Sequence, residues 1–439
     1  MTARATSDDI VSRLVESLPE DILVVDPARM EKYRHDWTRY LSAGRPIAVV
    51  RAETASQVQT ALRWASAHRV PVVPRGAGTS LAGGATAVDG CVVVCTERMT
   101  ALEIDPVNRV AVAGPGVLNV DLKQAAATHG LWYPPDPASF RISSIGGNVA
   151  TNAGGLCCLK YGVTADYVLG LDVVLPDGRL ITLGGRRIKD VAGLSLLQLF
   201  VGSEGTLGII TRVVLRLVPQ QDPATTFVAY FSNAQDAGTA VVRICARLRP
   251  SLLELLDRVT INLIEDYRPM GLDRAAGAML IGQSDAPGRA RSADLAVMVE
   301  CCRAAGAGTV VTAENPAEAD LILEARRAAG PAVDARGPVL IEDVCVPVDR
   351  LPDVLDASRP SPRRGTWRSP SPPTLATATY TRPSSTPPTI RLRYTGHSRP
   401  WTKSCRLPST TAVPSPANTA SAAPNATRSP ASSAPTSWI

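Results

Sequence analysis

The stretch Pro71-Val-Val-Pro-Arg-Gly-Ala-Gly-Thr-Ser-Leu-Ala-Gly-Gly-Ala85 decides the fold, because a short apolar run breaks there into a glycine-rich turn. Glycine has no Cβ and adopts positive φ at little cost, so backbone N–H groups in such a turn can close on an anion such as phosphate. A dinucleotide-binding G-x-G-x-x-G would need glycine at Leu81, and a P-loop would need Lys-Ser/Thr in place of Ala85-Thr86. Taken alone, the turn fits a plain surface loop about as well as a phosphate cradle.

Two further polar-glycine runs favour the cradle: Ile145-Gly-Gly-Asn-Val-Ala-Thr-Asn-Ala-Gly-Gly155 and Gly202-Ser-Glu-Gly-Thr-Leu-Gly208. With Pro135-Asp-Pro137, Lys160-Tyr-Gly162 and Lys189-Asp-Val-Ala-Gly193, they resemble in order and spacing the FAD-binding domain of the vanillyl-alcohol oxidase/PCMH superfamily. The likeness is closest to the branch of FAD-linked 2-hydroxyacid dehydrogenases, which holds D-lactate dehydrogenase, D-2-hydroxyglutarate dehydrogenase and the glycolate oxidase FAD subunit. It covers residues 10 to 356.

The resemblance implies an α+β fold, with a two-subdomain PCMH-type FAD-binding domain, a partial α+β substrate cap and a disordered tail. The expected boundaries are a helical lead-in at 1–43, the FAD domain at 44–220, the cap at 221–356 and the tail at 357–439.

The pattern of apolar residues predicts the elements around the first glycine turn. A strand at 46–51, a helix at 54–69 and a strand at 70–74 form a β-α-β unit that leads into the turn. Farther on, Pro176-Asp-Gly178 between two apolar runs predicts a β-hairpin. An alternating strand is expected at 207–217.

By resemblance, three loops cradle the pyrophosphate and isoalloxazine of FAD, mainly through backbone N–H groups. The residues implied are Arg75, Gly76, Ala77, Gly78, Thr79 and Ser80 in the first loop; Pro137, Gly146, Gly147, Asn148, Thr151, Asn152, Gly154 and Gly155 in and before the second; and Glu204, Gly205, Gly208 and Ile210 in and after the third. Some members of the superfamily tether FAD through a His or Cys in the first loop. Because Thr79 occupies that position, the sequence predicts non-covalent FAD.

Arg326 lies in Leu323-Glu-Ala-Arg-Arg-Ala-Ala-Gly-Pro-Ala-Val333, which matches the family stretch whose arginine pairs with the substrate carboxylate. A guanidinium fork suits a carboxylate. Without the neighbouring motifs an exposed helix arginine would be the plainer interpretation, and with them carboxylate binding is favoured. The reaction implied is hydride transfer from the α-carbon of a 2-hydroxy acid to flavin N5 (EC 1.1 class). The family takes its base and metal ligands from His-Ala-Gly-Asp-Gly-Asn-Leu-His and Gly-Glu-His-Gly, and this sequence contains neither, so catalytic residues stay unassigned and no metal is expected.

Charge and cysteine content narrow the class of protein. Net charge is +6, but residues 357–439 hold eleven Lys and Arg and no acids, which leaves 35 cations and 40 acids before them. An acidic globular part argues against nucleic-acid binding. The nine cysteines show no C-x-x-C spacing, so they are expected to be buried free thiols in a reducing cytosol. No signal or span of twenty apolar residues occurs, so a cytoplasmic protein is expected, with peripheral attachment to a membrane left open.

The tail changes composition abruptly, since fifteen of the 36 prolines lie in 357–439. Such a composition predicts disorder.

The genetic code suggests a further hypothesis about the tail. Codons for Pro373–Arg382, read from the third base, permit His-Ala-Gly-Asp-Gly-Asn-Leu-His-Pro, and the same shift over Ala412–Ala422 permits Gly-Thr-Val-Thr-Gly-Glu-His-Gly-Val-Gly. Both missing motifs reappear in order, so we infer that the reading frame slips between about Asp356 and Ser361.

The sequence is therefore interpreted as an FAD-linked 2-hydroxyacid dehydrogenase whose activity is impaired by a non-native C-terminus. The alternatives are an FAD-binding subunit of a glycolate oxidase-like complex and a non-catalytic flavin-binding remnant. An aryl-alcohol or sugar-lactone oxidase is disfavoured by the absent tether and by the Arg326 stretch. The expected partners are a small 2-hydroxy acid and an electron acceptor (quinone, cytochrome or Fe–S protein); a homodimer stays open.

Overall fold

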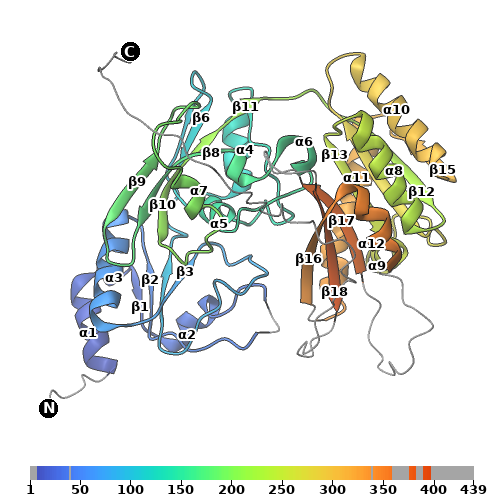
Figure 1. Ribbon diagram of the computed structural model, residues 1–439. Coiled ribbons are helices and arrows are strands. Elements are labelled where there is room, and N and C mark those ends of the chain that lie inside the picture. Colours follow the sequence, from blue (N-terminus) through green and yellow to red (C-terminus); the bar gives the residue numbers. More distant parts are fainter. Residues whose placement is uncertain (1–6, 39–40, 338–339, 358–374, 382–388, 397–439) are drawn as a thin grey trace, which may run out of the picture. The chain divides into compact units, whose positions relative to one another are not determined.

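The computed structural model describes residues 7–38, 41–337, 340–357, 375–381 and 389–396 (Figure 1). Helices, including three short 3-10 turns (η), are α1 (Ser7–Ser17), α2 (Pro27–Met30), η1 (Glu31–Tyr33), α3 (Ala55–His68), α4 (Asn119–Ala127), α5 (Ile145–Ala150), α6 (Cys158–Tyr161), η2 (Thr164–Asp166), α7 (Leu197–Phe200), α8 (Ala234–Arg247), α9 (Arg258–Tyr267), α10 (Ala290–Ala304), α11 (Pro316–Asp334), η3 (Val348–Arg350) and α12 (Leu351–Ala357). Strands are β1 (Leu23–Val24), β2 (Ala48–Arg51), β3 (Val72–Arg75), β4 (Val92–Cys95), β5 (Leu102–Asp105), β6 (Val110–Ala113), β7 (Leu131–Trp132), β8 (Val168–Val174), β9 (Leu180–Gly184), β10 (Ile209–Arg216), β11 (Val218–Pro219), β12 (Thr225–Phe231), β13 (Leu252–Asp257), β14 (Ala278–Ser284), β15 (Thr309–Thr312), β16 (Leu340–Pro347), β17 (Leu375–Thr381) and β18 (Thr389–Gly396).

The first sheet has the order β1-β2-β4-β3, and β2 and β3 both run parallel to β4. The connecting helix α3 begins with a capping box formed by Thr54 and Gln57, and it ends where Arg69 adopts the left-handed conformation at φ 55°. Its buried face packs on β2 and β4 in one apolar cluster. The predicted β-α-β unit is confirmed, with element ends shifted by one or two residues.

The second sheet has the order β5-β6-β10-β8-β9 and is antiparallel throughout. The hairpin predicted from Pro176-Asp-Gly178 joins β8 to β9, and Gly178 supplies the positive φ of 81° that the turn requires. Strand β10 is central and carries Val213 and Leu215 into a buried cluster with α4 and α5. The third glycine run therefore opens directly into the middle of this sheet.

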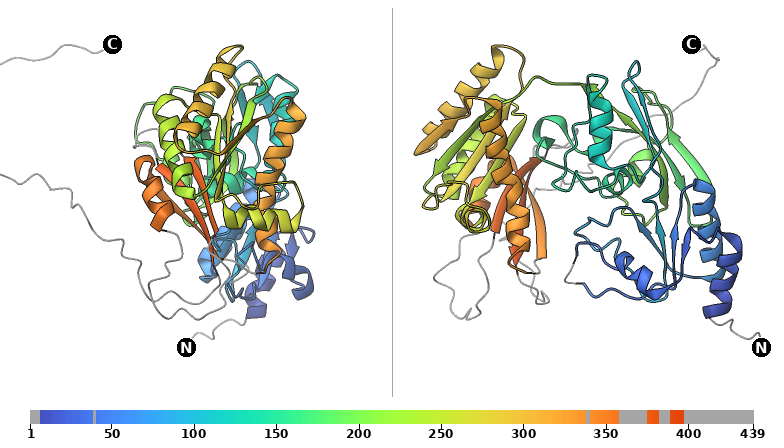
Figure 2. Two further views of the ribbon diagram at one scale, coloured as in Figure 1. Left: turned by 90° about the vertical axis from the view of Figure 1, so that its right-hand side faces the viewer. Right: turned by 180° about the vertical axis from the view of Figure 1, so that it is seen from behind.

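The third large sheet has the order β15-β12-β14-β13-β17-β18-β16. Side chains alternate across it: Phe227, Ala229 and Phe231 of β12 pack in a cluster with α8, α10 and α12, whereas Val228 packs in a second cluster with α9 and α11. Helices thus cover both faces of the sheet, as the views in Figure 2 show.

Strands β17 and β18 lie in the segment for which composition predicts disorder, and the structure differs from that prediction there. Strand β17 pairs with β13 on one side and with β18 on the other, and β18 in turn pairs with β16. The overall proline content of the tail hides two proline-free runs, 375–381 and 389–396, in which Thr, Tyr, Ile and Leu favour extended backbone. The other residues of 358–439 lie outside the described part of the chain.

Candidate functional site

The first glycine loop leaves the end of β3 and presents unbonded backbone donors. The N–H groups of Gly76, Gly78, Thr79 and Ser80 donate to no acceptor in the described part of the chain. Gly78 has φ 73°, which a residue with a Cβ rarely adopts. The loop therefore offers several N–H groups to a ligand, as a phosphate cradle requires.

The side chain of Arg75 is occupied within the protein. Its guanidinium donates to the carbonyl oxygens of His35 at 2.9 Å, Ala85 at 3.3 Å and Lys32 at 3.4 Å. These bonds tie the loop to the 32–35 segment. The structure thus gives the predicted arginine a bracing contact, and leaves the backbone as the part of the loop that faces a ligand.

The second loop is built around α5, whose N-cap Ser144 accepts a hydrogen bond from Gly147 N at 3.3 Å. The same hydroxyl accepts from Ala77 N at 3.3 Å, and a Cβ on Gly76 would lie 2.6 Å from it. Ser144, which is not among the predicted site residues, therefore joins the first loop to the second. Its position three residues before Gly147 was the available signal, because Ser is a strong N-cap residue.

Three polar side chains predicted to reach the ligand form hydrogen bonds with neighbouring groups of the protein. Asn148 is buried, accepts from Asn119 Nδ2 at 3.0 Å and donates to Ser143 Oγ at 3.1 Å. Thr151 Oγ1 donates to Gly147 O at 2.9 Å. Asn152 accepts from Ala165 N at 2.9 Å and has φ 47°. These contacts fix the shape of the second loop.

Gly155 lies against Asp136 of the Pro135-Asp-Pro137 turn. A Cβ on Gly155 would collide with the backbone of Asp136, and Cys157 N donates to Asp136 Oδ1 at 3.1 Å. Burial raises the pKa of the Asp136 carboxyl, and nearby Lys123 opposes that shift. Burial lowers the pKa of Lys123, whose Nζ donates to Tyr133 O at 2.5 Å. Pro137 is buried and Gly154 is half-buried behind the loop.

The third loop docks on the second through its backbone. Gly202 N donates to Val149 O at 3.0 Å, and Glu204 N donates to Ala150 O at 2.8 Å. Glu204 and Gly205 both have positive φ, 52° and 77°. Glu204 is the costlier case, because a side chain with a Cβ is strained there.

The third loop also touches the first. A Cβ on Gly205 would lie 2.7 Å from Pro74 Cγ, and one on Gly84 would lie 3.3 Å from Glu204 Oε2. The carboxylate of Glu204 is exposed at this junction. Beyond the loop, Gly208 and Ile210 are buried, Gly208 against Val173 and Ile210 in the core of the second sheet. The structure therefore brings the three predicted loops into mutual contact, with Gly208 and Ile210 behind them.

Arg326 does not join the loops. It lies on α11, where its Nε donates to Glu254 Oε2 at 2.5 Å, and the two side chains are 11% and 0% exposed. Glu254 is on β13, on the face that α9 and α11 cover. In this structure the predicted substrate arginine is therefore part of a buried ion pair.

Two further contacts near the loops were not predicted from the sequence. Asp36 accepts from Ala85 N at 3.3 Å and from Thr86 Oγ1 at 2.9 Å, which closes the far end of the first loop. Asp285, just after β14, accepts from both Lys160 and Tyr161. The Lys160-Tyr-Gly162 motif thus contacts the third sheet. The sequence did not indicate this contact, because Tyr161 and Asp285 are 124 residues apart.

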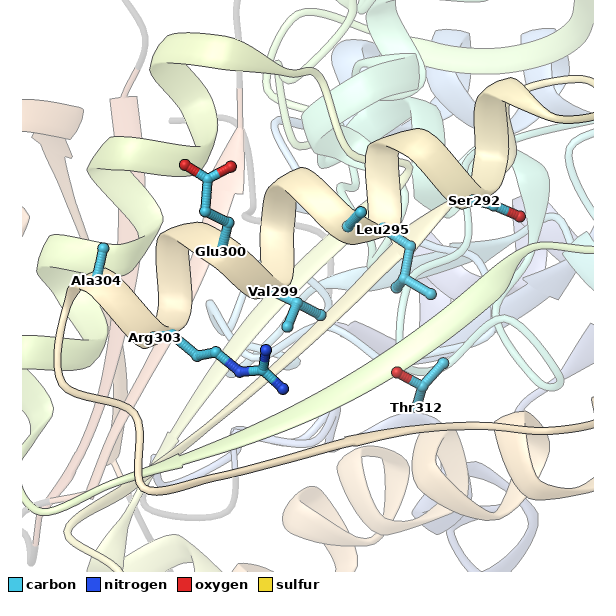
Figure 3. Close-up of a pocket in the computed structure, with 8 residues that line it drawn as sticks. Ser292, Leu295, Val299, Glu300, Arg303, Ala304 and Thr312 are labelled. Atoms are coloured by element: carbon cyan, nitrogen blue, oxygen red, sulfur yellow. The ribbon is translucent and has the colours of Figure 1, made fainter.

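A cavity of about 580 Å³ lies on α10 and β15 (Figure 3). Glu300 and Arg303 are the charged residues that line it, and its lining includes no residue of the three loops. Within the described ranges, no group of three His, Cys, Asp or Glu side chains could hold a metal ion. Over the same ranges, no helix combines the length and apolar character needed to cross a membrane.

Comparison with protein families identifies two matching segments. Residues 46–184 match the family described as FAD binding domain, and residues 220–367 match the family described as FAD linked oxidases, C-terminal domain. The first segment contains the first two loops in full. The cofactor of the chain is therefore FAD, and the free N–H groups and Cβ-intolerant glycines of the loops fit its pyrophosphate.

Two relatives extend the match beyond single domains. Glycolate oxidase subunit GlcD of Bacillus subtilis (strain 168) is 41% identical over 354 residues, which cover 80% of this chain and 75% of that protein. D-lactate dehydrogenase of Archaeoglobus fulgidus is 40% identical over 260 residues, which cover 58% of this chain and 56% of that protein. The chain thus spans three quarters of the first relative and little more than half of the second.

Solved structures share the fold. Alkyldihydroxyacetonephosphate synthase superposes with a TM-score of 0.71 at 19% identity, covering 89% of this chain and 81% of that one. p-Cresol methylhydroxylase superposes with a TM-score of 0.70 at 16% identity, covering 90% and 83%. The predicted PCMH-type α+β fold is confirmed. With the match to GlcD, these findings show that the chain belongs to the family of FAD-linked oxidoreductases that includes glycolate oxidase subunit GlcD and D-lactate dehydrogenase.

Proposed function

We propose that the chain derives from an enzyme that oxidises a 2-hydroxy acid of the D-lactate, glycolate or D-2-hydroxyglutarate type to the 2-oxo acid. The observation that carries the proposal is the mutual contact of three polar-glycine loops far apart in sequence. The names of the relatives, glycolate oxidase subunit and D-lactate dehydrogenase, support the substrate class.

The first loop has a direct role in this proposal. The first loop binds the FAD pyrophosphate through its free N–H groups, and Ser144 and Arg75 hold that loop in shape. Bound FAD supplies the acceptor for the hydride that leaves the α-carbon, while the hydroxyl proton passes to a base. Thr79 offers no nucleophile of the His or Cys kind, so FAD is held without a covalent bond.

Turnover by this chain is expected to be weak or absent. Its four histidines are His35, His68, His129 and His397, and none lies in the sequence context of the two family motifs. The proposed frame slip after Asp356 explains their absence. A second candidate function, flavin binding without catalysis, follows from the same observation and applies to the chain as written. For the parent protein, an alternative proposal is that it is the FAD-binding subunit of a larger complex. Co-purification with an Fe–S protein would support this alternative.

The test compares the chain as written with a version whose reading frame is corrected after Asp356. Both are purified, loaded with FAD and mixed anaerobically with D-lactate, glycolate or D-2-hydroxyglutarate while flavin absorbance is recorded. Bleaching of the corrected protein alone is the expected result. Reduction by dithionite is the control for intact flavin, and acid precipitation should leave the flavin in the supernatant.

Each other result has a definite meaning. If neither protein retains flavin, the assignment of the three loops is wrong. If both retain it and none of the acids bleaches either one, the 2-hydroxy acid proposal fails while flavin binding stands. If both bleach equally, the missing motifs are unnecessary and the frame-slip argument loses its functional basis. A yellow acid pellet would show a covalent bond to FAD.

A further inference from the structure

A second cavity, of about 660 Å³, lies at the end of the second sheet and is lined by several cationic side chains. Four of the residues that line it are cationic, namely Arg109, Lys160, Arg216 and Arg249, and one, Asp166, is acidic. Two tyrosines, Tyr161 and Tyr167, complete its polar wall. Its lining residues come from around β6, α6, β10 and β11 and from the segment after α8.

The arginines of this cavity are not neutralised by protein carboxylates. Among the described residues, Arg109, Arg216 and Arg249 have no Asp or Glu oxygen within the 4.0 Å of an ion pair. Lys160 differs, because Asp285 pairs with it. Elsewhere in the described chain many arginines are paired, as Arg212 is with Asp172 at 2.6 Å. Like charges that share a cavity repel, so this arrangement stores unfavourable energy that an anion would relieve.

Arg216 supplies a buried donor within the cavity. Its guanidinium carbon lies 5.0 Å from the centre of the Tyr167 ring, within the range of a cation–π contact. Its Nε is buried and has no hydrogen-bond partner among the described residues. A buried N–H without an acceptor costs free energy that a ligand oxygen could return.

Arg109 adds a backbone observation. It has φ 54°, in the region that favours Gly and Asn, at the turn between β5 and β6. Its carbonyl accepts from Leu217 N at 2.7 Å, which ties the turn to the strand that carries Arg216. The sheet thus stabilises the left-handed backbone of Arg109, whose side chain lines the cavity.

We propose that this cavity is a binding site for a small anion that presents a phosphate or carboxylate group, distinct from the three flavin loops. Guanidinium forks match the oxygens of both groups. Arg216 provides the buried donor, and Arg109 and Arg249 close on the anion from the exposed sides. The proposal does not depend on the hydroxy acid reaction.

The test measures thermal unfolding of the full chain saturated with FAD, so that the pyrophosphate cradle is already filled. Inorganic phosphate or malonate is titrated at constant ionic strength set with sodium chloride. We expect one of them to raise the unfolding midpoint in a saturable way. A rise with phosphate alone assigns a phosphate ligand, and a rise with malonate alone assigns a carboxylate.

Two exposed arginines are replaced and Arg216 is kept, because its buried Nε makes a folding defect more probable there. Arg109→Asn removes the guanidinium and suits the left-handed backbone, and Arg249→Gln removes the second fork. Each should weaken the apparent affinity at least about tenfold. Arg303→Gln, in the lining of the α10 cavity (Figure 3), is the matched control and should leave the affinity unchanged.

Modification of arginine by phenylglyoxal gives a second measurement that needs no variant. Phosphate or malonate should slow modification of Arg109 and Arg249 in mass spectra and leave Arg303 unaffected. The proposal is overturned if neither anion shifts the midpoint, if both variants respond like the unsubstituted chain, or if neither anion protects the two arginines.

Discussion

Arg326 and Glu254 show how a residue whose type fits one role can be committed to another. The pair is almost fully buried, and Glu254 has no exposure to water. Replacing Arg326 by methionine would remove the ion pair between this arginine and the buried carboxylate, and breaking a buried ion pair costs about 3–5 kcal/mol. Arg326→Met is therefore expected to lower the free energy of unfolding by that amount in a urea titration.

Arg327→Met is the matched control, since Arg327 pairs with Glu324 one turn away and both side chains are more than a third exposed. That surface pair should be worth under about 1 kcal/mol. If the two variants lose equal stability, the buried pair is not structural, and the guanidinium is free to bind a substrate carboxylate as the sequence predicts.

For some single residues, the sequence predicts the ability to form hydrogen bonds but not the partner. Asn148, Thr151 and Asn152 were assigned to the ligand because short polar side chains in a glycine run suit phosphate. In the structure they hold the second loop together. A sequence shows that a side chain can donate or accept a hydrogen bond. It does not show that residues 119, 143 and 165 supply the partners.

At the scale of elements, the close packing of the third loop against β3 can be tested with one pair of glycines. Gly205 and Gly193 have nearly the same backbone, φ 77° and 78°. A Cβ on Gly205 would meet Pro74 at 2.7 Å, whereas one on Gly193 would meet nothing within 4 Å. Alanine at either position costs about 1 kcal/mol or more for the backbone alone.

Only Gly205→Ala should also push the third loop away from the first. We expect it to weaken FAD binding at least about tenfold, equivalent to about 1.4 kcal/mol, while Gly193→Ala leaves the affinity near that of the unsubstituted chain. Fluorescence titration of the apoprotein with FAD measures both. Equal losses would mean that loop packing does not shape the cradle.

Elements with strong local signals were predictable. The α3 capping box, the Asp-Gly hairpin and the apolar run of β10 each arise from neighbours in the chain, so they are visible in the sequence. Strands β17 and β18 were not predicted. Their pairing with β13 and β16 is long-range, and composition averaged over 83 residues conceals two short proline-free runs.

At the scale of the whole molecule, Asp285 joins the motif after the second loop to the third sheet. Lys160 and Tyr161 both bond to its nearly buried carboxylate, and Leu159 beside them packs in the cluster of that sheet. Asp285→Ala removes both bonds at once and leaves the Lys160 ammonium half-buried. We expect thermal unfolding to become less cooperative, with a separate early transition in calorimetry.

The exposed Asp190 pairs with Arg187 and serves as the control. Asp190→Ala should leave a single transition with its midpoint nearly unchanged, because such surface pairs contribute little. A single unshifted transition in Asp285→Ala would show that apolar packing alone couples the sheets.

The central place of β10 has a consequence for how the protein is made. A nascent chain that has reached Phe200 already contains β5, β6, β8 and β9, but β6 and β8 have no common neighbour until Ile209–Arg216 is translated. The third loop directly precedes that strand, so one short stretch completes both the sheet and the flavin cradle. All three polar-glycine loops therefore lie upstream of the proposed frame slip between about Asp356 and Ser361, so they are translated before the point at which the frame changes.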